Sequence, residues 1–439
     1  MNKKVNFERS KLYNLTPKGL RTVYVESFTS YLIRIASQHN VSPGHLVNKL
    51  IGPNMDKEFL LQSTLRGGNR FYDGAKTLNG FMDNSVDTVR SLECLTKRND
   101  LGDLTFQKWK GVLTIRELFK SSLSWCPLCI KETFETGGED VYYPLIWTLK
   151  VLKCCVIHNC QLLNQCPQCE KSVPILHRQI ILGYCPYCYV RLDKVNAVIP
   201  ITKEDYIWNS FIIRNIEELF SLTNKEAKIT RGNMAGNFRS INQSIFKGNI
   251  DRFSQSINVP RSTLRGWING VALPPLEKQL RLCFKFNVSF IDIIFKPNIV
   301  VDFSNELVKK EAQHIIPTAC FKFDYEIAKQ KLEDYIYKEN SLSMEAIALK
   351  IGYSKRVLYR NFPEMCRKLS RRHKQYQTER KKYRISIQKQ KISYAYYHLT
   401  DQGIYASRRK VETFLDEPGL LREKELQDYW KELISVSNN

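Results

Sequence analysis

Cys126-Pro127-Leu128-Cys129 opens a series of four ligand pairs, which continues with Cys155-Val156-Ile157-His158, Cys166-Pro167-Gln168-Cys169 and Cys185-Pro186-Tyr187-Cys188. Each pair has two residues between its members, and so tight a turn directs both ligand atoms to one side, as half of a tetrahedral site. Eight such ligands predict two zinc ions. Pairing in chain order gives the sets Cys126, Cys129, Cys155, His158 and Cys166, Cys169, Cys185, Cys188. This is the simplest assignment, although the spacing alone also allows an interleaved pairing.

Both zinc ions are expected to be structural, because four protein ligands leave no open position for a substrate or a water. A zinc deaminase would place a glutamate two residues after the ligand histidine, but Asn159 and Cys160 follow His158. Cys154 and Cys160 remain as spare cysteines, interpreted as small buried hydrophobic residues. The odd total of 13 cysteines and the absence of a visible export signal favour metal sites over disulfides and a cytoplasmic location.

The composition points to a polyanionic partner. The 439 residues are 43% hydrophobic, as in a globular protein, and carry a formal net charge of +23. No apolar run has the length of a membrane span, so we expect no membrane association and favour nucleic acid as the polyanion.

We expect a mainly α, multidomain fold with short β-strands, such as 179–182, in the zinc-knuckle region. In the stretch from Glu26 to Ala36, apolar residues recur on one helical face, which predicts an N-terminal helix. Residues 201–228 are predicted as a linking helix. The expected regions are 1–125 (N-terminal helical), 126–200 (double zinc knuckle), 201–300 (linker helix and helix-turn-helix), 301–390 (second helix-turn-helix with a basic helix) and 391–439 (third hairpin or helix-turn-helix).

Three segments have the pattern helix, sharp turn, helix: Asp251–Gly270, Met344–Phe362 and Ser393–Leu415. Asn258 and Gly352 suit the left-handed turn position, and Ser354 and Ser407 suit the cap of the second helix. The first segment resembles the Cro/repressor type, whose second helix enters the major groove. For the third segment, a plain helical hairpin remains an alternative.

The second helices are expected to contact DNA through their exposed starts, and the basic stretch after Phe362 to contact phosphates. From residue 351 to 400, fourteen Lys or Arg face only Glu364 and Glu379. The expected contact residues are Arg261, Ser262, Thr263, Arg265, Ser354, Lys355, Arg356, Tyr359, Arg360, Arg371, Arg372, Lys374, Ser407, Arg408, Arg409 and Lys410.

The combination of the Glu26–Ala36 stretch, the Trp125–Cys129 knuckle, Trp147 and the run from Cys155 to Cys169 resembles the TniQ/TnsD family of transposon target selectors. The long helical C-terminal half is similar to TnsD rather than to the short TniQ proteins. The resemblance implies a non-catalytic bacterial protein associated with the nucleoid. Such a protein recognises a double-stranded attachment site and recruits an AAA+ ATPase regulator, which in turn brings the transposase.

Two other functions compete with this one. The first is a TniQ adaptor that docks on an RNA-guided CRISPR complex and would not itself need to recognise a DNA sequence. The helix-turn-helix segments argue against it. The second alternative, a zinc-dependent nuclease or the transposase itself, is an enzyme. The sequence has no phosphate-binding Walker A run, since Ala75 follows Gly74 where a lysine is needed, and no acidic triad stands out.

Overall fold

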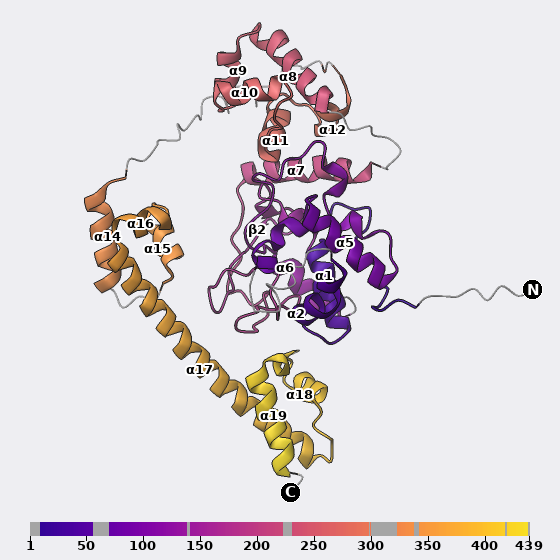
Figure 1. The fold of residues 1–439 in the computed structure, drawn as a ribbon, viewed down its shortest axis with the longest axis vertical. Helices are drawn as coiled ribbons and strands as arrows, with labels where there is room; N and C mark the ends of the chain where they lie inside the picture. Colours follow the sequence, from indigo (N-terminus) through magenta and orange to yellow (C-terminus); the bar gives the residue numbers. More distant parts are fainter. Residues whose placement is uncertain are drawn as a thin grey trace, which may run out of the picture. The chain divides into compact units, whose positions relative to one another are not determined.

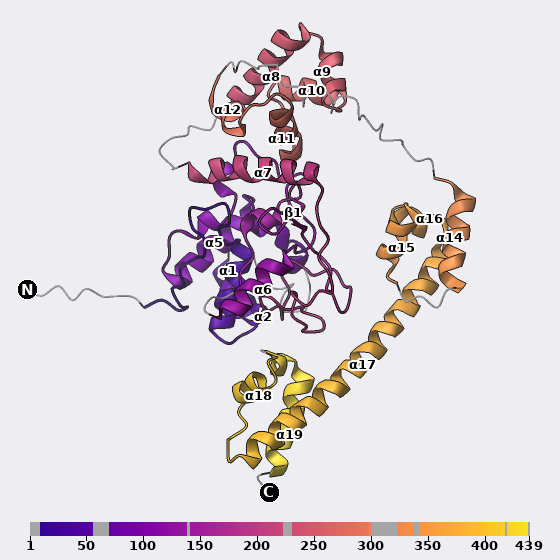
Figure 2. The same ribbon diagram turned by 180° about the vertical axis from the view of Figure 1, so that it is seen from behind.

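The computed structural model describes residues 9–55, 70–137, 141–222, 231–297, 299, 323–337, 342–417 and 419–437. The chain divides into two compact units, Met1–Ile315 and Ile316–Asn439, which are described separately below. The prediction of a mainly α fold is confirmed (Figures 1 and 2). Within the described residues, the sheet structure consists of β1 (Cys154–Cys155) and β2 (Cys160–Gln161), which pair antiparallel. No described helix is long and apolar enough to cross a membrane.

The first part of the Met1–Ile315 unit consists of helices and short helical turns packed around one core. They are α1 (Phe28–Gln38), α2 (Pro43–Leu46), η1 (Val47–Ile51), η2 (Gly52–Asn54), α4 (Arg70–Asp73), η3 (Ala75–Asn79), α5 (Asp83–Thr96), η4 (Leu101–Leu104), η5 (Gln107–Trp109), α6 (Pro127–Thr136) and η6 (Leu145–Thr148). The predicted N-terminal helix is α1, whose start is capped by the side chain of Ser27. Every residue of α1 from Phe28 to Ala36 is buried, so α1 lies at the centre of this core.

A buried ion pair anchors the start of α1. Glu26 accepts hydrogen bonds from Arg34 Nε (3.0 Å) and Nη2 (2.7 Å), from Ser30 Oγ (3.2 Å) and from the backbone N–H of Lys18 (3.2 Å). Arg34 also donates to the carbonyl of Thr16 at 2.9 Å. Glu26 is fully buried and Arg34 is 4% exposed. The network therefore joins α1 to the chain segment that precedes it, and its charges are paired as burial requires.

The ligand pairs lie at the start of α6, at the β1–β2 hairpin and in two loops, and these segments pack on the core through hydrogen bonds rather than in a regular sheet. Trp125 is fully buried, exchanges backbone hydrogen bonds with Leu163, and donates its indole N–H to the carbonyl of Leu192 at 3.1 Å. The predicted strand over 179–182 is wrong. The chain turns there, because the N–H of Gln179 bonds to the ring of His177 and that of Ile180 to the His177 carbonyl.

The second part of this unit is a helical bundle of α7 (Lys203–Ser221), α8 (Arg231–Phe246), α9 (Ile250–Ser256), α10 (Arg261–Ile268), α11 (Leu276–Lys285) and α12 (Phe290–Phe295). The predicted linking helix over 201–228 is α7, and residues 223–228 lie outside the described residues. The buried hydrophobic cluster continues from the N-terminal helices into this bundle. Phe106 packs against Phe220, and Gln279 donates to the carbonyl of Val112 at 3.1 Å.

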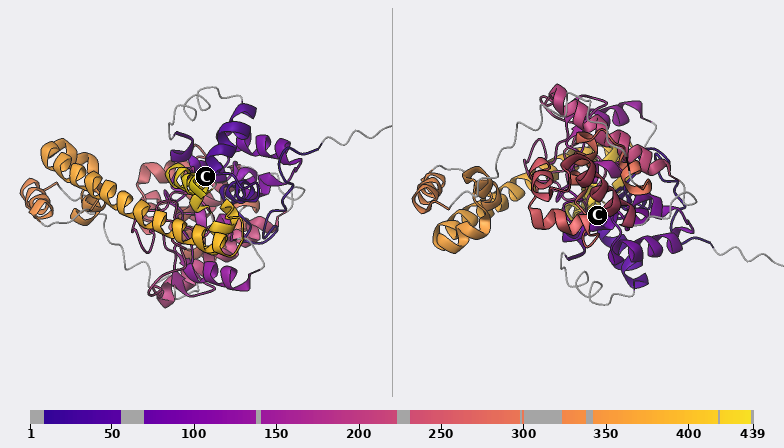
Figure 3. Two further views of the ribbon diagram at one scale, coloured as in Figure 1. Left: turned by 90° about the horizontal axis from the view of Figure 1, so that it is seen from below. Right: turned by 90° about the horizontal axis from the view of Figure 1, so that it is seen from above.

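The Ile316–Asn439 unit is organised along one long helix, α17 (Pro363–Asp401) (Figure 3). The other elements of the unit are α14 (Tyr325–Tyr337), α15 (Met344–Ile351), α16 (Lys355–Asn361), α18 (Arg408–Phe414), η7 (Leu420–Arg422) and α19 (Lys424–Ser437). One small core joins α14, α15 and α16 to the start of α17, and a second joins α18 and α19 to its end. The expected division between residues 390 and 391 falls inside α17.

Candidate metal centres and nucleic-acid interface

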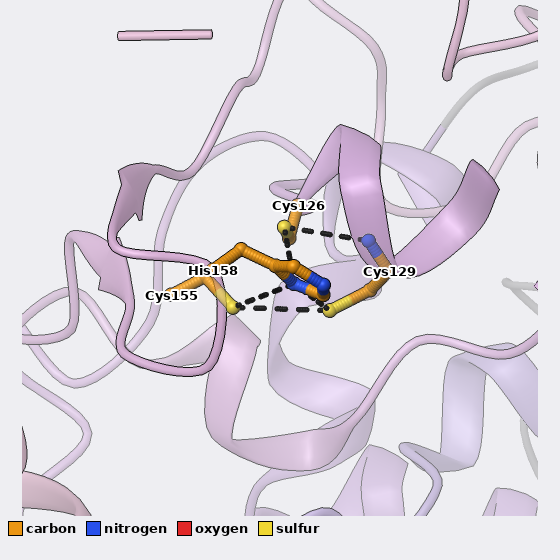
Figure 4. A group of neighbouring side chains, drawn as sticks. All are labelled: Cys126, Cys129, Cys155 and His158. Atoms are coloured by element: carbon orange, nitrogen blue, oxygen red, sulfur yellow. Dashed lines mark hydrogen bonds between the residues drawn. The ribbon is translucent and has the colours of Figure 1, made fainter. Parts of the chain in front are cut away.

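The first four ligands meet at one point (Figure 4). The ligand atoms of Cys126, Cys129, Cys155 and His158 lie within 4.8 Å of one another. Cys126 caps α6, where its Sγ accepts the backbone N–H of Cys129 at 3.5 Å. Hydrogen bonds from the thiols of Cys129 and Cys155 lower the pKa of Cys126 to about 3. Cys126 therefore favours the thiolate, the form of cysteine that binds metals.

Glu132 orients the histidine of this group. His158 Nε2 donates to Glu132 Oε1 at 2.8 Å, so Nδ1 carries the lone pair and faces the sulfurs, 3.2 Å from Cys129 Sγ. Burial alone would lower the pKa of His158, but the hydrogen bonds to Glu132 and Cys155 raise it overall. A carboxylate behind a ligand histidine is the usual outer partner in zinc sites.

Replacing Glu132 with alanine is expected to lower the zinc affinity of the first group by about 10-fold, at the low end for such outer partners because Glu132 is largely exposed. Titration of the pure protein against a competing chelator measures the change. Glu135→Ala is the matched control, since Glu135 lies on the same helix and forms only an exposed pair with Lys131. Equal affinities for the two variants would show that Glu132 does not support the ligand.

The second group has four sulfur ligands from two knuckles. The Sγ atoms of Cys166, Cys169, Cys185 and Cys188 lie within 4.8 Å of one another. Hydrogen bonds from the other three thiols lower the pKa of Cys169. Backbone N–H groups support the sulfurs as well, with Cys169 N donating to Cys166 Sγ at 3.4 Å. Both groups thus follow chain order, and their soft donor sets suit zinc.

Positive φ angles turn the chain immediately after three of the four ligand pairs, at Asn159 (49°), Glu170 (56°) and Tyr189 (61°). The turns close as the N–H groups of Glu170 and Tyr189 bond to the carbonyls of Cys166 and Cys185, each at 2.9 Å. This local conformation closes these three knuckles, whereas Cys126 and Cys129 are held together by the start of α6.

The two spare cysteines differ in their surroundings. Cys160 is fully buried, and its Sγ lies 3.5 Å from Cys126 Sγ, beside the first group. Cys154 is buried outside both groups. Sequence spacing could not separate these cases, because Cys160 comes near the first group through its pairing with Cys155 across β1 and β2.

The Asp251–Gly270 segment forms two helices with the expected turn. Asn258 has φ 49°, and the N–H of Val259 bonds to the carbonyl of Ser254 at 3.0 Å. Helix α10 then buries Leu264, Trp267 and Ile268. The opposite face is exposed and carries the expected residues Arg261, Ser262, Thr263 and Arg265.

The Met344–Phe362 segment repeats this geometry. Gly352 has φ 88°, and Ser354 caps α16 by accepting the N–H of Val357 at 3.3 Å. Lys355, Arg356 and Arg360 are exposed on α16.

The third segment uses the end of α17 as its first helix. Gly403 has φ 71°, the N–H of Ile404 bonds to the carbonyl of Leu399, and Ser407 caps α18. Arg409 and Lys410 are exposed at the start of α18. The turn is two residues longer than in the second segment, counted from the left-handed glycine to the capping serine.

Three expected contact residues are only partly exposed and have partners within the chain, while the exposed Arg261 and Lys355 form surface ion pairs with Asp251 and Glu345. The prediction that Tyr359 is exposed is wrong, because the ring is half-buried and its hydroxyl lies 2.6 Å from Ser370 Oγ. Arg372 donates to the carbonyls of Tyr335 (3.3 Å) and Ile336 (2.7 Å) and so caps the end of α14. Arg408 donates to the buried Glu412 at 3.3 Å. Arg371 and Lys374, in contrast, are exposed on α17.

The same turn also occurs where no surface helix follows. Asn287 has φ 49°, Val288 N bonds to the carbonyl of Cys283, and Ser289 caps α12. Helix α12, however, buries Phe290, Ile293 and Ile294 and carries no basic start. The turn alone therefore identifies a helix pair, whereas the exposed basic start of the second helix distinguishes α10, α16 and α18.

Comparison with known proteins gives one match. A search of curated proteins found no significant similarity. Residues 17–162 match the TniQ family model, a span that runs from before α1 to the end of β2 and includes the first ligand group. TniQ domains occur in transposon-associated proteins and in adaptors of CRISPR-associated transposons, and members of the family are non-enzymatic DNA-binding adaptors. The N-terminal third of the chain is therefore similar to the TniQ domain.

Proposed function

We propose that this protein is a TnsD-like target selector of a transposon, which binds an attachment site in double-stranded DNA and has no catalytic activity of its own. The observation that carries the proposal is the set of three exposed, basic helix starts, each placed after a helix and a left-handed turn. The TniQ match and the net charge of +23 support it independently.

Base readout is assigned to the starts of α10, α16 and α18, where exposed side chains project from short helices that pack on a hydrophobic core through one face. Phosphate contacts are assigned to exposed basic residues of α17, including Arg371 and Lys374. Tyr359, Arg372 and Arg408 position these elements instead of contacting DNA. Two zinc ions, held by the two ligand groups, would stabilise the loops that pack on the N-terminal core.

The protein partners are an AAA+ ATPase regulator and, through it, the transposase. This part of the proposal rests on the resemblance to target selectors and on the TniQ match, which covers the N-terminal region. Co-purification of the full chain with an AAA+ ATPase encoded beside it tests the partner directly.

Arg356→Ala and Arg360→Ala are each expected to weaken DNA binding by roughly 10- to 100-fold, the range for losing one good base contact. Neither change should alter the melting temperature, because both side chains are exposed. Fluorescence anisotropy with duplex DNA selected by the wild type gives the affinities. Lys331→Ala is the control, because Lys331 is exposed on α14, which packs on the same small core as α16 but is not one of the helices proposed to contact DNA. Unchanged affinity in both arginine variants would remove α16 from the interface.

The competing adaptor function makes a different prediction for the isolated protein. An adaptor on an RNA-guided complex needs no sequence preference, whereas a target selector must prefer its site over random duplex. Selection from a random duplex pool, followed by affinity measurement on the enriched and the random DNA, separates the two. A preference below a few-fold would favour the adaptor.

The enzyme alternative is tested by incubating the pure protein with plasmid and with attachment-site DNA in magnesium or manganese. We expect no cleavage. Cleavage that disappears on mutating specific carboxylates would replace the target-selector proposal with a nuclease or transposase.

A further inference from the structure

The two ends of α17 carry helix pairs of the same kind, and this shared helix sets the distance between them. Helix α17 has 39 residues, about 58 Å at 1.5 Å per residue. After Pro363 it contains no proline or glycine. Its first turns contribute Cys366 and Leu369 to one small core, and its last turns contribute Ile392 and Leu399 to the other.

Specific contacts place α16 and α18 along α17. Tyr359 of α16 bonds to Ser370, and Phe414 of α18 packs against Tyr394 and His398, with ring centroids 6.0 and 4.9 Å apart. The two attachment points are about 26 residues apart, which corresponds to about 39 Å along the helix. At 3.6 residues per turn, Tyr394 and His398 lie about 120° and 80° around α17 from Ser370, on the same side of it. Both short helices therefore emerge from the same half of its circumference.

This spacing fits the repeat of duplex DNA. Helix-turn-helix dimers read half-sites about 34–36 Å apart, one turn of the duplex, where the major groove faces the same side again. The attachment points on α17, about 39 Å apart, come within about 5 Å of that separation in a single chain.

The part of α17 between the two cores suits the phosphates that lie between two such major-groove segments. No residue from 371 to 384 is buried, and Glu379 is its only acidic residue. Exposed cations include Arg371, Lys374 and Lys382. Their mutual repulsion would be relieved by phosphates along the intervening backbone.

We propose that α17 acts as a ruler, so that α16 and α18 read two DNA segments centred about 10 to 12 base pairs apart. This inference rests on the proposed function, since it specifies the layout of the DNA site. In this arrangement the starts of α16 and α18 bind the same DNA molecule at once. Because α17 links them, binding of one raises the effective concentration of the other at its DNA segment, and the combined affinity exceeds that of either contact alone.

Footprinting of the full-length protein on duplex DNA selected from a random pool tests the distance. The footprint should contain two protected DNA segments, here called blocks, centred about one turn of the duplex apart. Arg356→Ala and Arg409→Ala should each remove protection from a different block. Loss of protection from the same block in both variants, or blocks more than about 15 base pairs apart, would contradict the proposal that α17 sets the spacing. Failure to select any DNA sequence would instead contradict the proposed function.

Spacer variants of the selected DNA test rigidity. Inserting 5 or 10 base pairs between the blocks should each weaken binding by about 100-fold or more, because tethering of the second contact is lost. The same insertions outside the blocks are the control. Undiminished binding to the 10-base-pair variant would show a flexible connection and would also overturn the proposal.

A protein variant tests the helix itself. Thr378→Pro interrupts α17 between the two cores, and Thr378→Ala is its control. The proline variant should bind two-block DNA no more tightly than DNA with one block, while each block alone is bound as by the wild type. Equal affinity of both variants for two-block DNA would contradict the proposal.

Discussion

Cys129→Ser is expected to reduce the zinc content from two ions per chain to one and to destabilise the Met1–Ile315 unit severely. The serine removes one of four ligands that lie within 4.8 Å of one another. Structural zinc contributes about 10–16 kcal/mol in small zinc-finger peptides, as much as the whole net stability of a typical domain, about 5–15 kcal/mol. Cys126, which caps α6, belongs to the same hydrophobic core as α1, so the loss spreads beyond the knuckle.

Metal analysis of the purified variant, together with its thermal unfolding curve, measures this effect. Cys94→Ser is the matched control, because Cys94 is an exposed cysteine on α5 that belongs to neither ligand group. It should retain two zinc ions and the wild-type melting temperature. Two ions still bound to Cys129→Ser would show that the ligand assignment is wrong.

Glu26→Ala should lower the free energy of unfolding by about 3–5 kcal/mol, the usual effect of removing one partner of a buried ion pair. Arg34, which is 4% exposed, would lose both of its hydrogen bonds to the Glu26 carboxylate, and a buried guanidinium that loses its counter-charge is strongly unfavourable. The N–H of Lys18 and the hydroxyl of Ser30 would lose an acceptor as well.

Denaturant unfolding followed by circular dichroism gives the difference in stability. Asp103→Ala breaks an exposed pair with Lys108 in the same unit and should change the stability by less than about 1 kcal/mol. A similar, small effect of the two substitutions would mean that the Glu26–Arg34 pair contributes no more than a surface contact.

Local sequence patterns predicted the local structure well. The expected helix over Glu26–Ala36 is α1, shifted by two residues because Ser27 caps it and Glu26 stands outside it. Asn258 and Gly352 adopt the left-handed turns foreseen for them. The ligand pairs formed knuckles because the two-residue spacing and the following turn are properties of a few consecutive residues. The strand expected over 179–182 failed because no neighbouring segment pairs with it there.

The candidate interface was predictable only in part. Positive charge near a helix start or in a basic stretch is visible in the sequence, and it selected Arg356 as well as Arg372 and Arg408. The last two donate to groups that packing brings close: the end of α14, some 36 residues earlier in the chain, and the buried Glu412. Burial of a partner is a tertiary property, so composition could not separate the two kinds of arginine.

The sequence by itself determined the eight ligands, the turns, the helix caps and the excess of positive charge, because each depends on residue type at short spacing. Only the tertiary structure decided that the ligands group in chain order, that Glu26 and Arg34 form a buried pair, that Cys160 lies beside Cys126, and that one continuous α17 serves two cores. These features join residues that are distant in the chain or depend on which helix faces are covered. They arise when apolar faces pack together and fix which polar groups must find partners away from water.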